Sequence, residues 1–207
     1  MNLGTLYIIS APSGAGKSTL IKKFIKIKSL YKFYFSVSYT TRNIRINEFN
    51  KKHYYFITKK KFHQMKLKNY FLEYEKIFNN YYGTSKKKIK NMLKKGIDVF
   101  LDINWKGAQT IRKKISNTKS IFILPPSKNE LEKRLYKRGK DSKNSIIERI
   151  YNSKEEIKHY YEYDYLIINK DINIALQDLK HIYFSNKLEL NKQKKYYSSL
   201  IKKLITD

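Results

Sequence analysis

The chain has 207 residues, enough for one compact domain with a substantial core. It contains no cysteine, which excludes a disulfide scaffold, a thiolate metal site and cysteine nucleophile chemistry. No apolar run approaches the roughly 20 residues that span a bilayer, and no charged and apolar leader precedes the first predicted strand. We therefore expect a cytoplasmic protein.

The formal net charge of +28 points at first to nucleic-acid binding. Of the 45 basic residues, however, 39 are lysines, and they are spread over nearly every segment beside many Ile, Asn and Tyr residues. AT-rich codons specify these residue types, so a base bias would give this composition without any binding function. We expect solvated lysines and no dedicated nucleic-acid partner. A nucleic-acid binder, which would concentrate its charge on one face and bind with a steep salt dependence, stays as the alternative.

The first predicted elements are a strand over residues 6–10 and a helix over 18–28, joined by the sequence Ala-Pro-Ser-Gly-Ala-Gly-Lys-Ser at 11–18. A strand, a glycine-rich turn and a helix form the context of a phosphate loop, with an ordinary glycine turn as the alternative. Backbone N–H groups and the helix dipole would face the phosphates. Lys17 would reach the β/γ-phosphates and Ser18 would ligate Mg²⁺. The usual pattern opens with Gly, and Ala11 fits there if its φ stays negative.

Residues 36 to about 83 contain short β-like pieces at 35–39 and 53–57, many aromatics and a small helix near 62–67. They look like an inserted lobe. Further strands are predicted at 97–102, 120–124 and 165–169, alternating with helices at 85–95, 108–115, 128–137, 145–161 and 171–190. This alternation predicts a parallel α/β sheet with right-handed crossovers.

Two features of the C-terminal half stand apart from this pattern. Residues 128–154 are charged and predict a helical hairpin with an exposed turn at 138–142. The end of the chain is a basic amphipathic helix with an apolar face at residues 197, 200, 201, 204 and 205. We expect this face to pack on the core of the chain or on a second copy, which would make a homo-oligomer, rather than on a membrane.

The arginines fall mostly into two clusters, Arg42 with Arg45, and Arg134 with Arg138 and Arg149. A guanidinium group binds phosphate as a bidentate fork that lysine cannot copy. In a chain so rich in lysine, this clustering indicates phosphate sites, with chance as the alternative. An apolar strand also ends at residue 102 in an aspartate, which is typical of the Mg²⁺ site of phosphate-loop enzymes.

Five segments match, in order, motifs of the guanylate kinases: 36–45 followed by Glu48 and Tyr54, then 80–84, 101–107, 122–127 and 134–139. The first reads Ser-Val-Ser-Tyr-Thr-Thr-Arg-Asn-Ile-Arg and the second Asn-Tyr-Tyr-Gly-Thr. The likeness runs nearly from end to end. The chain therefore resembles the bacterial form of this family, which carries no extra interaction domains.

The resemblance implies an α/β fold of the phosphate-loop nucleoside-monophosphate kinase type, with a parallel sheet core flanked by helices. The core with the phosphate loop would span 1–35, 85–126 and 155–207, the GMP-binding lobe 36–84, and the helical lid 127–154. The implied activity is transfer of the γ-phosphate of ATP to GMP, giving ADP and GDP, in guanine nucleotide salvage. ATP and GMP would be the small-molecule partners and Mg²⁺ the cofactor, with no dedicated nucleic-acid or membrane partner.

The resemblance also implies the site residues. Those assigned to ATP are Ala11, Pro12, Ser13, Gly14, Ala15, Gly16, Lys17, Ser18, Thr19, Arg134, Arg138 and Asn169. Those assigned to GMP are Ser38, Arg42, Arg45, Tyr54, Glu73, Tyr82, Thr84 and Asn104. Catalysis is assigned to Lys17, Arg42, Arg138 and Arg149, and the metal to Ser18 and Asp102. Glu73 would accept hydrogen bonds from the guanine N1–H and 2-amino group, which adenine lacks.

Some positions depart from the family pattern. Asn104 stands where a second carboxylate is usual, Asn47 and Lys51 stand where glycines are usual, and Lys170 interrupts a late Asn-Asp-Asp motif. A non-catalytic interaction module of this fold is a further alternative. Such a module would lose the phosphate loop, and this chain retains its glycines, Lys17 and Ser18.

Overall fold

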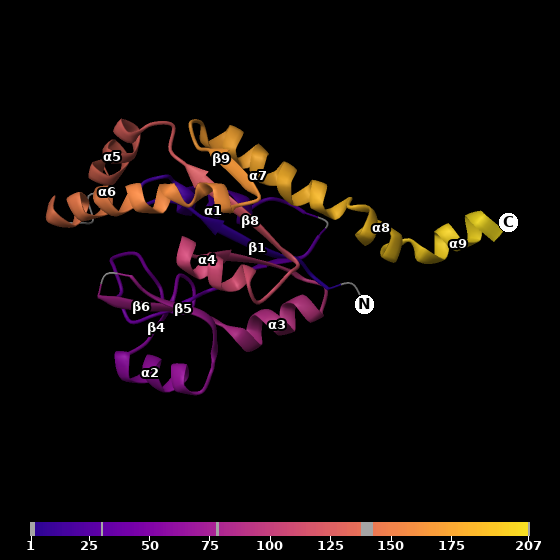
Figure 1. Cartoon of the computed structure of the whole chain (residues 1–207), viewed down its shortest axis with the longest axis horizontal. Coiled ribbons are helices and arrows are strands. Elements are labelled where there is room, and N and C mark those ends of the chain that lie inside the picture. The colour runs from indigo at the N-terminus through magenta and orange to yellow at the C-terminus, as the bar shows by residue number, and fades with distance from the viewer. Residues whose placement is uncertain (1–2, 30, 78, 138–142, 207) are drawn as a thin grey trace. The chain divides into compact units, whose positions relative to one another are not determined.

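A computed structural model describes residues 3–29, 31–77, 79–137 and 143–206 of the chain (Figure 1). The chain divides into two compact units. The lobe unit comprises Leu3–Ser10 and Leu30–Ser120, and the loop unit comprises Ala11–Ser29 and Ile121–Asp207. Each unit is described in turn.

The core of the lobe unit is a set of parallel strands. These are β1 (Leu6–Ser10), β2 (Phe33–Phe35) and β7 (Asp98–Asp102), in the order β2-β7-β1. Every residue of β1 is buried, and Tyr7 stacks on Phe100 with ring centroids 4.6 Å apart. These strands confirm the predictions at 6–10 and 97–102. Continuous apolar runs of this length are typical of buried parallel strands.

Two helices flank these strands within the lobe unit. Helix α3 (Lys86–Lys94) packs against β7, and α4 (Trp105–Arg112) packs against β1. Helix α4 begins three residues before its predicted start at 108, because Asn104 caps it. The side-chain oxygen of Asn104 accepts a hydrogen bond from the Gly107 amide at 2.9 Å. The first turn has no apolar periodicity, so the capping asparagine was the signal that marked the start.

The inserted lobe is a sheet of four strands in the order β4-β3-β6-β5. The strands are β3 (Tyr39–Thr40), β4 (Tyr55–Phe56), β5 (Phe71–Ile77) and β6 (Asn80–Ser85). Strands β3 and β4 are parallel, whereas β6 is antiparallel to both β3 and β5. Helix α2 (Lys59–Leu67) covers the sheet through Phe62, which is fully buried and stacks on Phe71 at 4.5 Å.

The hairpin of β5 and β6 was not predicted from the sequence. Strand β5 buries a charged side chain and exposes an aromatic one, since Glu73 is only 5% exposed whereas Tyr74 is 42% exposed. The register between β5 and β6 also shifts between Phe71 and Glu73. A β-bulge of this kind re-aims a side chain and breaks the period of two by which a strand is recognised.

The loop unit contains β9 (Tyr165–Ile168) and, parallel to it, the part of β8 (Thr118–Leu124) from Ile121 onward. The long helix α7 (Ile172–Lys187) packs against β9. Helix α1 (Lys17–Ile25) packs on α7, where Phe24 meets the edge of Tyr183 at 5.7 Å. Helices α5 (Lys128–Lys137) and α6 (Lys143–Lys158) pack on each other as the predicted hairpin, and a short 3₁₀ helix, η1 (Tyr160–Glu162), follows.

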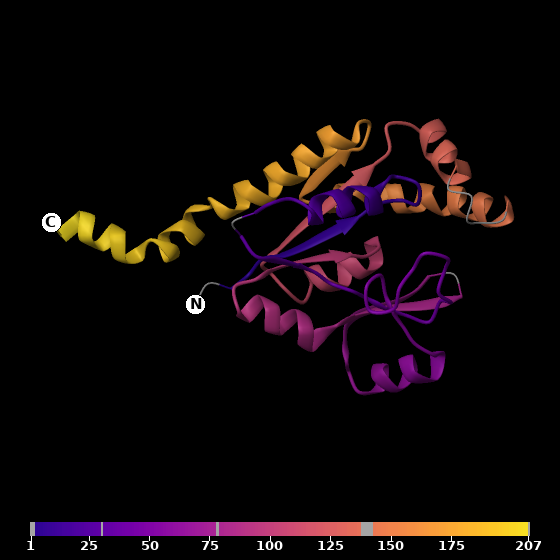
Figure 2. The ribbon, with the colours of Figure 1, turned by 180° about the vertical axis from the view of Figure 1, so that it is seen from behind.

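The chain ends in two short helices, α8 (Leu190–Tyr196) and α9 (Ser198–Thr206). They continue from α7 and lead away from the strands of the loop unit (Figures 1 and 2). The apolar face of α9 is exposed, with Leu204 at 74% and Ile205 at 78%. Packing of this face on the core of the chain is therefore not found among the described residues. None of the helices described is long and apolar enough to cross a membrane.

Candidate active site

The glycine-rich loop follows directly after β1 and has the backbone that a phosphate loop requires. Gly14 and Gly16 have φ values of 92° and 88°, in the left-handed region that glycine adopts without strain. Gly16 is the residue that caps α1, so Lys17 and Ser18 open the first turn of that helix. Ala11 is not among the residues with positive φ, which meets the condition for alanine at that position.

Close packing behind the loop gives a second reason for its glycines. A Cβ atom on Gly14 would lie 3.0 Å from the Leu131 carbonyl oxygen and 3.1 Å from the Leu135 side chain, both on α5. A Cβ atom on Gly16 would collide with the Asn169 side-chain amide. That amide donates a hydrogen bond to the Ala15 carbonyl oxygen at 2.7 Å. Helix α5 and the end of β9 thus support the loop from behind.

Arg134 of α5 braces the same part of the loop. Its Nε donates to Glu130 at 2.8 Å, and its two terminal nitrogens donate to the carbonyl oxygens of Ala15, at 3.3 Å, and Asn169, at 3.1 Å. The guanidinium fork therefore connects α5, the loop and the residue after β9. These contacts hold the loop in shape.

Helix α6 contacts the loop at Ser13 through two side chains. Arg149 donates from Nη1 to the Ser13 hydroxyl at 3.0 Å, and the Ser13 amide donates to Oε2 of Glu156 at 3.2 Å. Burial raises the pKa of Glu156, against the lowering effects of Lys17, the Ser13 amide and Arg149. Glu156 was missed from the sequence. Its spacing of seven residues from Arg149, two helical turns, was the available signal. Arg138, predicted at the turn of the hairpin, lies outside the described residues.

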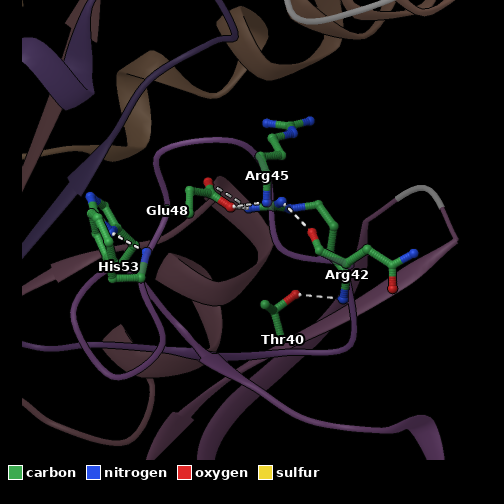
Figure 3. Close-up of polar contacts among 7 residues, drawn as sticks. Thr40, Arg42, Arg45, Glu48 and His53 are labelled. Carbon is green, nitrogen blue, oxygen red and sulfur yellow. Dashed lines mark hydrogen bonds and ion pairs between the residues drawn. The ribbon is translucent and has the colours of Figure 1, made fainter.

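In the lobe unit, Arg42 and Glu48 form an ion pair in which one guanidinium nitrogen contacts both carboxylate oxygens (Figure 3). Nη2 of Arg42 donates to both carboxylate oxygens, at 2.9 and 3.0 Å, and the same carboxylate accepts the Arg45 amide at 3.0 Å. These bonds hold the pKa of Glu48 below its usual value although burial alone would raise it. The Arg45 side chain points away from this pair (Figure 3). Glu48 thus fixes the turn from which both arginines project.

Two tyrosines lie beside Arg42. Its guanidinium carbon lies 5.5 Å from the centre of the Tyr54 ring, and Tyr54 meets Tyr82 edge to face at 5.9 Å. Burial raises the pKa of the Tyr54 phenol, and the nearby charge of Asp102, at the end of β7, raises it further. The structure therefore brings Arg42, Tyr54 and Tyr82 together, as the predicted phosphate site requires.

Glu73 is a buried carboxylate at the β5 bulge. Its Oε1 accepts a hydrogen bond of 2.5 Å from the hydroxyl of Thr84, which is fully buried on β6. Burial raises the pKa of Glu73 to about 7. Lys114 has the opposite effect on this pKa, and its ammonium group donates to the Leu72 carbonyl oxygen at 2.8 Å. The group is therefore poised between its charged and neutral forms near neutral pH.

Gly107 allows α4 to approach this carboxylate. A Cβ atom there would lie 2.9 Å from Oε2 of Glu73 and 3.3 Å from Oδ1 of Asn104. Asn104 is thus close to Glu73, with its side-chain oxygen occupied by the α4 cap. For Ser38, the structure gives a backbone bond, in which its carbonyl oxygen accepts the Tyr55 amide at 2.9 Å. Glu73, Thr84 and Asn104 therefore form one cluster.

Comparison with known proteins agrees with this chemistry. The family model described as guanylate kinase matches residues 3–186. This chain belongs to the guanylate kinase family. It is 54% identical over 205 residues to a guanylate kinase of Buchnera aphidicola, covering 99% of each chain, and 50% identical over 207 residues to that of Escherichia coli strain K12, covering 100% of each. Its fold resembles the crystal structure of guanylate kinase from Anaplasma phagocytophilum, with a TM-score of 0.79, 27% identity and 96% of each chain covered.

The expected fold class and enzyme class are confirmed by these matches. The chain has the α/β fold of the phosphate-loop kinases, and guanylate kinases are nucleoside-monophosphate kinases that use ATP and GMP. Two departures of this chain from the family pattern also have a structural consequence. Asn47 and Lys51, which replace glycines, have φ values of 66° and 67°. Lysine in this left-handed conformation costs about 1–2 kcal/mol.

Proposed function

We propose that this chain transfers the γ-phosphate of ATP to GMP with Mg²⁺, the loop unit holding ATP and the lobe unit holding GMP. The observation that carries this proposal is the intact phosphate loop. Gly14 and Gly16 have left-handed φ values, and Lys17 and Ser18 follow Gly16 in the first turn of α1. A non-catalytic module of the same fold would have no need of this backbone. Family membership supplies the reaction, and the residue roles below are our assignments.

The loop unit binds the ATP phosphates through backbone N–H groups and the N-terminal end of the α1 dipole. Lys17 adds a positive charge where negative charge moves as the γ-phosphoryl group leaves. Arg134 and Asn169 keep the Ala15 carbonyl oxygen in place and so keep the amides turned toward the phosphates. Arg149 closes on the transferring group from α6, and Arg138 acts with it from the hairpin turn.

The donor groups in the chain fit a magnesium ion held largely by substrate. Ser18 in the first turn of α1 and Asp102 at the carboxyl end of β7 would supply oxygen ligands. Among the described residues, no group of three His, Cys, Asp or Glu side chains could hold a metal by itself. Mg²⁺ in kinases commonly takes one or two protein ligands, with phosphates and water as the rest. An ion held there would supply positive charge that offsets the negative charge of the phosphate oxygens.

The lobe unit binds GMP through two sets of residues, one that holds the phosphate and one that surrounds the base. Arg42 and Arg45 hold the phosphate dianion with their guanidinium forks, assisted by the hydroxyls of Tyr54 and Tyr82. Glu48 acts through Arg42, because its carboxylate sets the direction of that guanidinium. The two phenol hydroxyls act as donors to the phosphate.

Glu73 selects guanine over adenine. As a carboxylate it accepts hydrogen bonds from N1–H and the 2-amino group, while Ser38, Thr84 and Asn104 complete the polar surroundings of the base. Adenine has a bare acceptor at N1, so AMP would leave the buried carboxylate without partners. Transfer itself needs no covalent enzyme intermediate, because positioning and charge neutralisation carry the reaction.

We also propose that the exposed face of α9 pairs with a second copy of the chain. Leu200, Leu204 and Ile205 are each at least half exposed on one side of this helix. Apolar faces of this kind are commonly covered by a partner. Sedimentation analysis of the whole protein and of the double variant Leu204→Glu, Ile205→Glu tests this: a mass reduced by the variant supports pairing, and an unchanged mass contradicts it.

A coupled assay of ADP formation tests the proposed reaction. GMP, AMP, UMP and dTMP are offered in turn with ATP and magnesium. We expect rapid turnover with GMP and at least about 100-fold lower kcat/KM with AMP, the range typical of sites built around a specific hydrogen bond. Equal use of AMP would contradict the guanine assignment. Absence of turnover with every acceptor would contradict the enzyme assignment.

A further inference from the structure

Glu156 lies in an unusual position for a negative charge, beside the loop that is proposed to hold the ATP phosphates. Its carboxylate accepts the Ser13 amide at 3.2 Å, and Ser13 is the third residue of that loop. Lys17 and Arg149 both lower its pKa, so the group lies within the field of two cations of the proposed ATP site. Neither the phosphate-loop motif nor the arginine clusters of the sequence draw attention to this residue.

The surrounding geometry holds Glu156 in this position. Arg149, Ser153 and Glu156 follow one another at intervals of four and three residues, which places them on the same face of α6. Ser153 is 3% exposed, and Ile146, one turn before Arg149, packs with Leu131 and Leu135 of α5. The same two leucines pack against Gly14 of the loop. Helix α6 is therefore anchored against the loop unit along this face, and the carboxylate cannot turn freely into solvent.

We propose that the carboxylate of Glu156 weakens the hold of the phosphate loop on nucleotide and so speeds the release of ADP. The inference rests on the proposed function. The negative charge offsets part of the positive charge of Lys17 and Arg149 and repels the phosphates both before and after transfer. Such an effect lowers the affinity for ATP and ADP alike. Product release limits turnover in many enzymes, and where it does, a weaker hold on the product raises kcat.

A glutamine substitution separates the effect of the hydrogen bond from the effect of the negative charge. Glu156→Gln keeps a side-chain oxygen that can accept the Ser13 amide but removes the negative charge. Burial raises the pKa of Glu156, which means that the charged form is costly in the folded protein. The glutamine variant should therefore be at least as stable as the wild-type protein. A role confined to holding the fold together predicts the opposite.

Glu155 offers a matched control. It is the preceding residue on the same helix, its side chain is 55% exposed, and it pairs with Lys158 at 2.7 Å in solvent. Glu155→Gln removes the same charge at nearly the same point of the chain but from the exposed face. A change found in Glu156→Gln and not in Glu155→Gln reports the buried position rather than the net charge of the protein.

The experiment uses the full chain in wild-type, Glu156→Gln and Glu155→Gln forms. Calorimetric titration with ADP gives the affinity, steady-state kinetics give kcat and KM for ATP, and thermal unfolding gives stability. For Glu156→Gln we expect ADP binding tighter by about 3- to 10-fold, a lower KM for ATP and a lower kcat, with an unchanged or higher Tm. Glu155→Gln should change ADP affinity and KM by less than about two-fold.

Three results would overturn the inference. If Glu156→Gln binds ADP no more tightly than the wild type does, the negative charge of Glu156 does not weaken nucleotide binding. A fall in both Tm and affinity assigns Glu156 a structural role. Equal changes in both variants assign the effect to the overall charge. Failure of the proposed function would appear differently, as a wild-type protein that neither binds ADP nor phosphorylates GMP.

Discussion

In the loop unit, the residues proposed to hold ATP lie mostly within eight consecutive positions, 11–18, whereas the residues proposed to hold GMP in the lobe unit are scattered from Ser38 to Asn104. The first region works largely through backbone N–H groups and small residues. The second works through side chains from strands β5 and β6 and from the segments that flank β3, β4 and β7. The loop can be recognised from a short stretch of sequence, whereas the scattered site comes together only in the folded lobe.

The carboxylates show a second contrast, which does not follow the division into two units. Glu48 holds Arg42 with two hydrogen bonds, and its pKa lies below the usual value. Burial raises the pKa of both Glu73 and Glu156. The first carboxylate stabilises its surroundings as a permanent charge. The other two are costly charges, which proteins keep mainly where function requires them.

The most severe test of the loop is Lys17→Ala. We expect kcat/KM to fall by about 100- to 1,000-fold or more, because Lys17 supplies charge where the phosphates need it in the transition state. Circular dichroism should show an unchanged fold, since the side chain contributes no apolar core. Wild-type kcat/KM in this variant would contradict the assignment of residues 11–18 as a phosphate loop.

Arg138 tests whether the proposed hold on the transferring phosphate extends to the hairpin turn. Arg138→Lys should lower kcat by about 10- to 100-fold with a smaller change in KM for GMP, because an ammonium keeps the charge but not the fork. The neighbouring exposed residue, Lys137, provides the control. Lys137→Ala should leave kcat and KM nearly unchanged in the same steady-state assay. Equal defects in the two variants would mean that the turn contributes only diffuse positive potential.

Gly107→Ala tests how far the scattered site depends on its supporting elements. The added Cβ would meet Oε2 of Glu73 at 2.9 Å and displace it. KM for GMP should rise by about 3- to 10-fold, whereas the helix itself gains from losing a glycine. KM for ATP should stay within about two-fold. Lys106→Ala, on the exposed side of the same turn, is the control, and a matching rise in that variant would contradict the steric explanation.

The smallest effect concerns the departure from glycine at Lys51. Its φ of 67° strains a lysine, so Lys51→Gly should raise the free energy of unfolding by about 0.5–1 kcal/mol once the chain entropy of glycine is subtracted. Lys52→Gly, next to it and without a positive φ, should lower the free energy instead. Denaturant unfolding of both variants measures the difference. A loss of stability in both would show that residue 51 is not strained.

The sequence was sufficient for the core strands, the hairpin of α5 and α6 and the phosphate loop, because continuous apolar runs and local glycine geometry determine them. It was insufficient where tertiary contacts reverse the local pattern. Strand β5 buries Glu73 and exposes Tyr74, so no periodicity could reveal it. The position of Glu73 was available only through the family resemblance. Glu156 carried no motif, and apart from its spacing from Arg149 only the contact with Ser13 in the structure identifies it.

One departure from the family pattern is explained by the structure. Asn104 lacks the charge of the usual carboxylate but caps α4 as well as aspartate would. The substitution therefore preserves the helix start that places Gly107 beside Glu73. For Lys170, nothing in the structure explains the substitution.

The pH dependence of KM for GMP tests the account of base recognition most directly. Because the pKa of Glu73 is raised to about 7, the carboxyl is mostly protonated below that pH and cannot accept both guanine donors. KM for GMP should therefore fall as the pH rises from about 6 to 8. In Glu73→Gln, KM should be about 10- to 100-fold higher and should keep only the pH dependence that the GMP phosphate itself contributes. The same pH profile in both proteins would contradict the assignment of Glu73 to guanine.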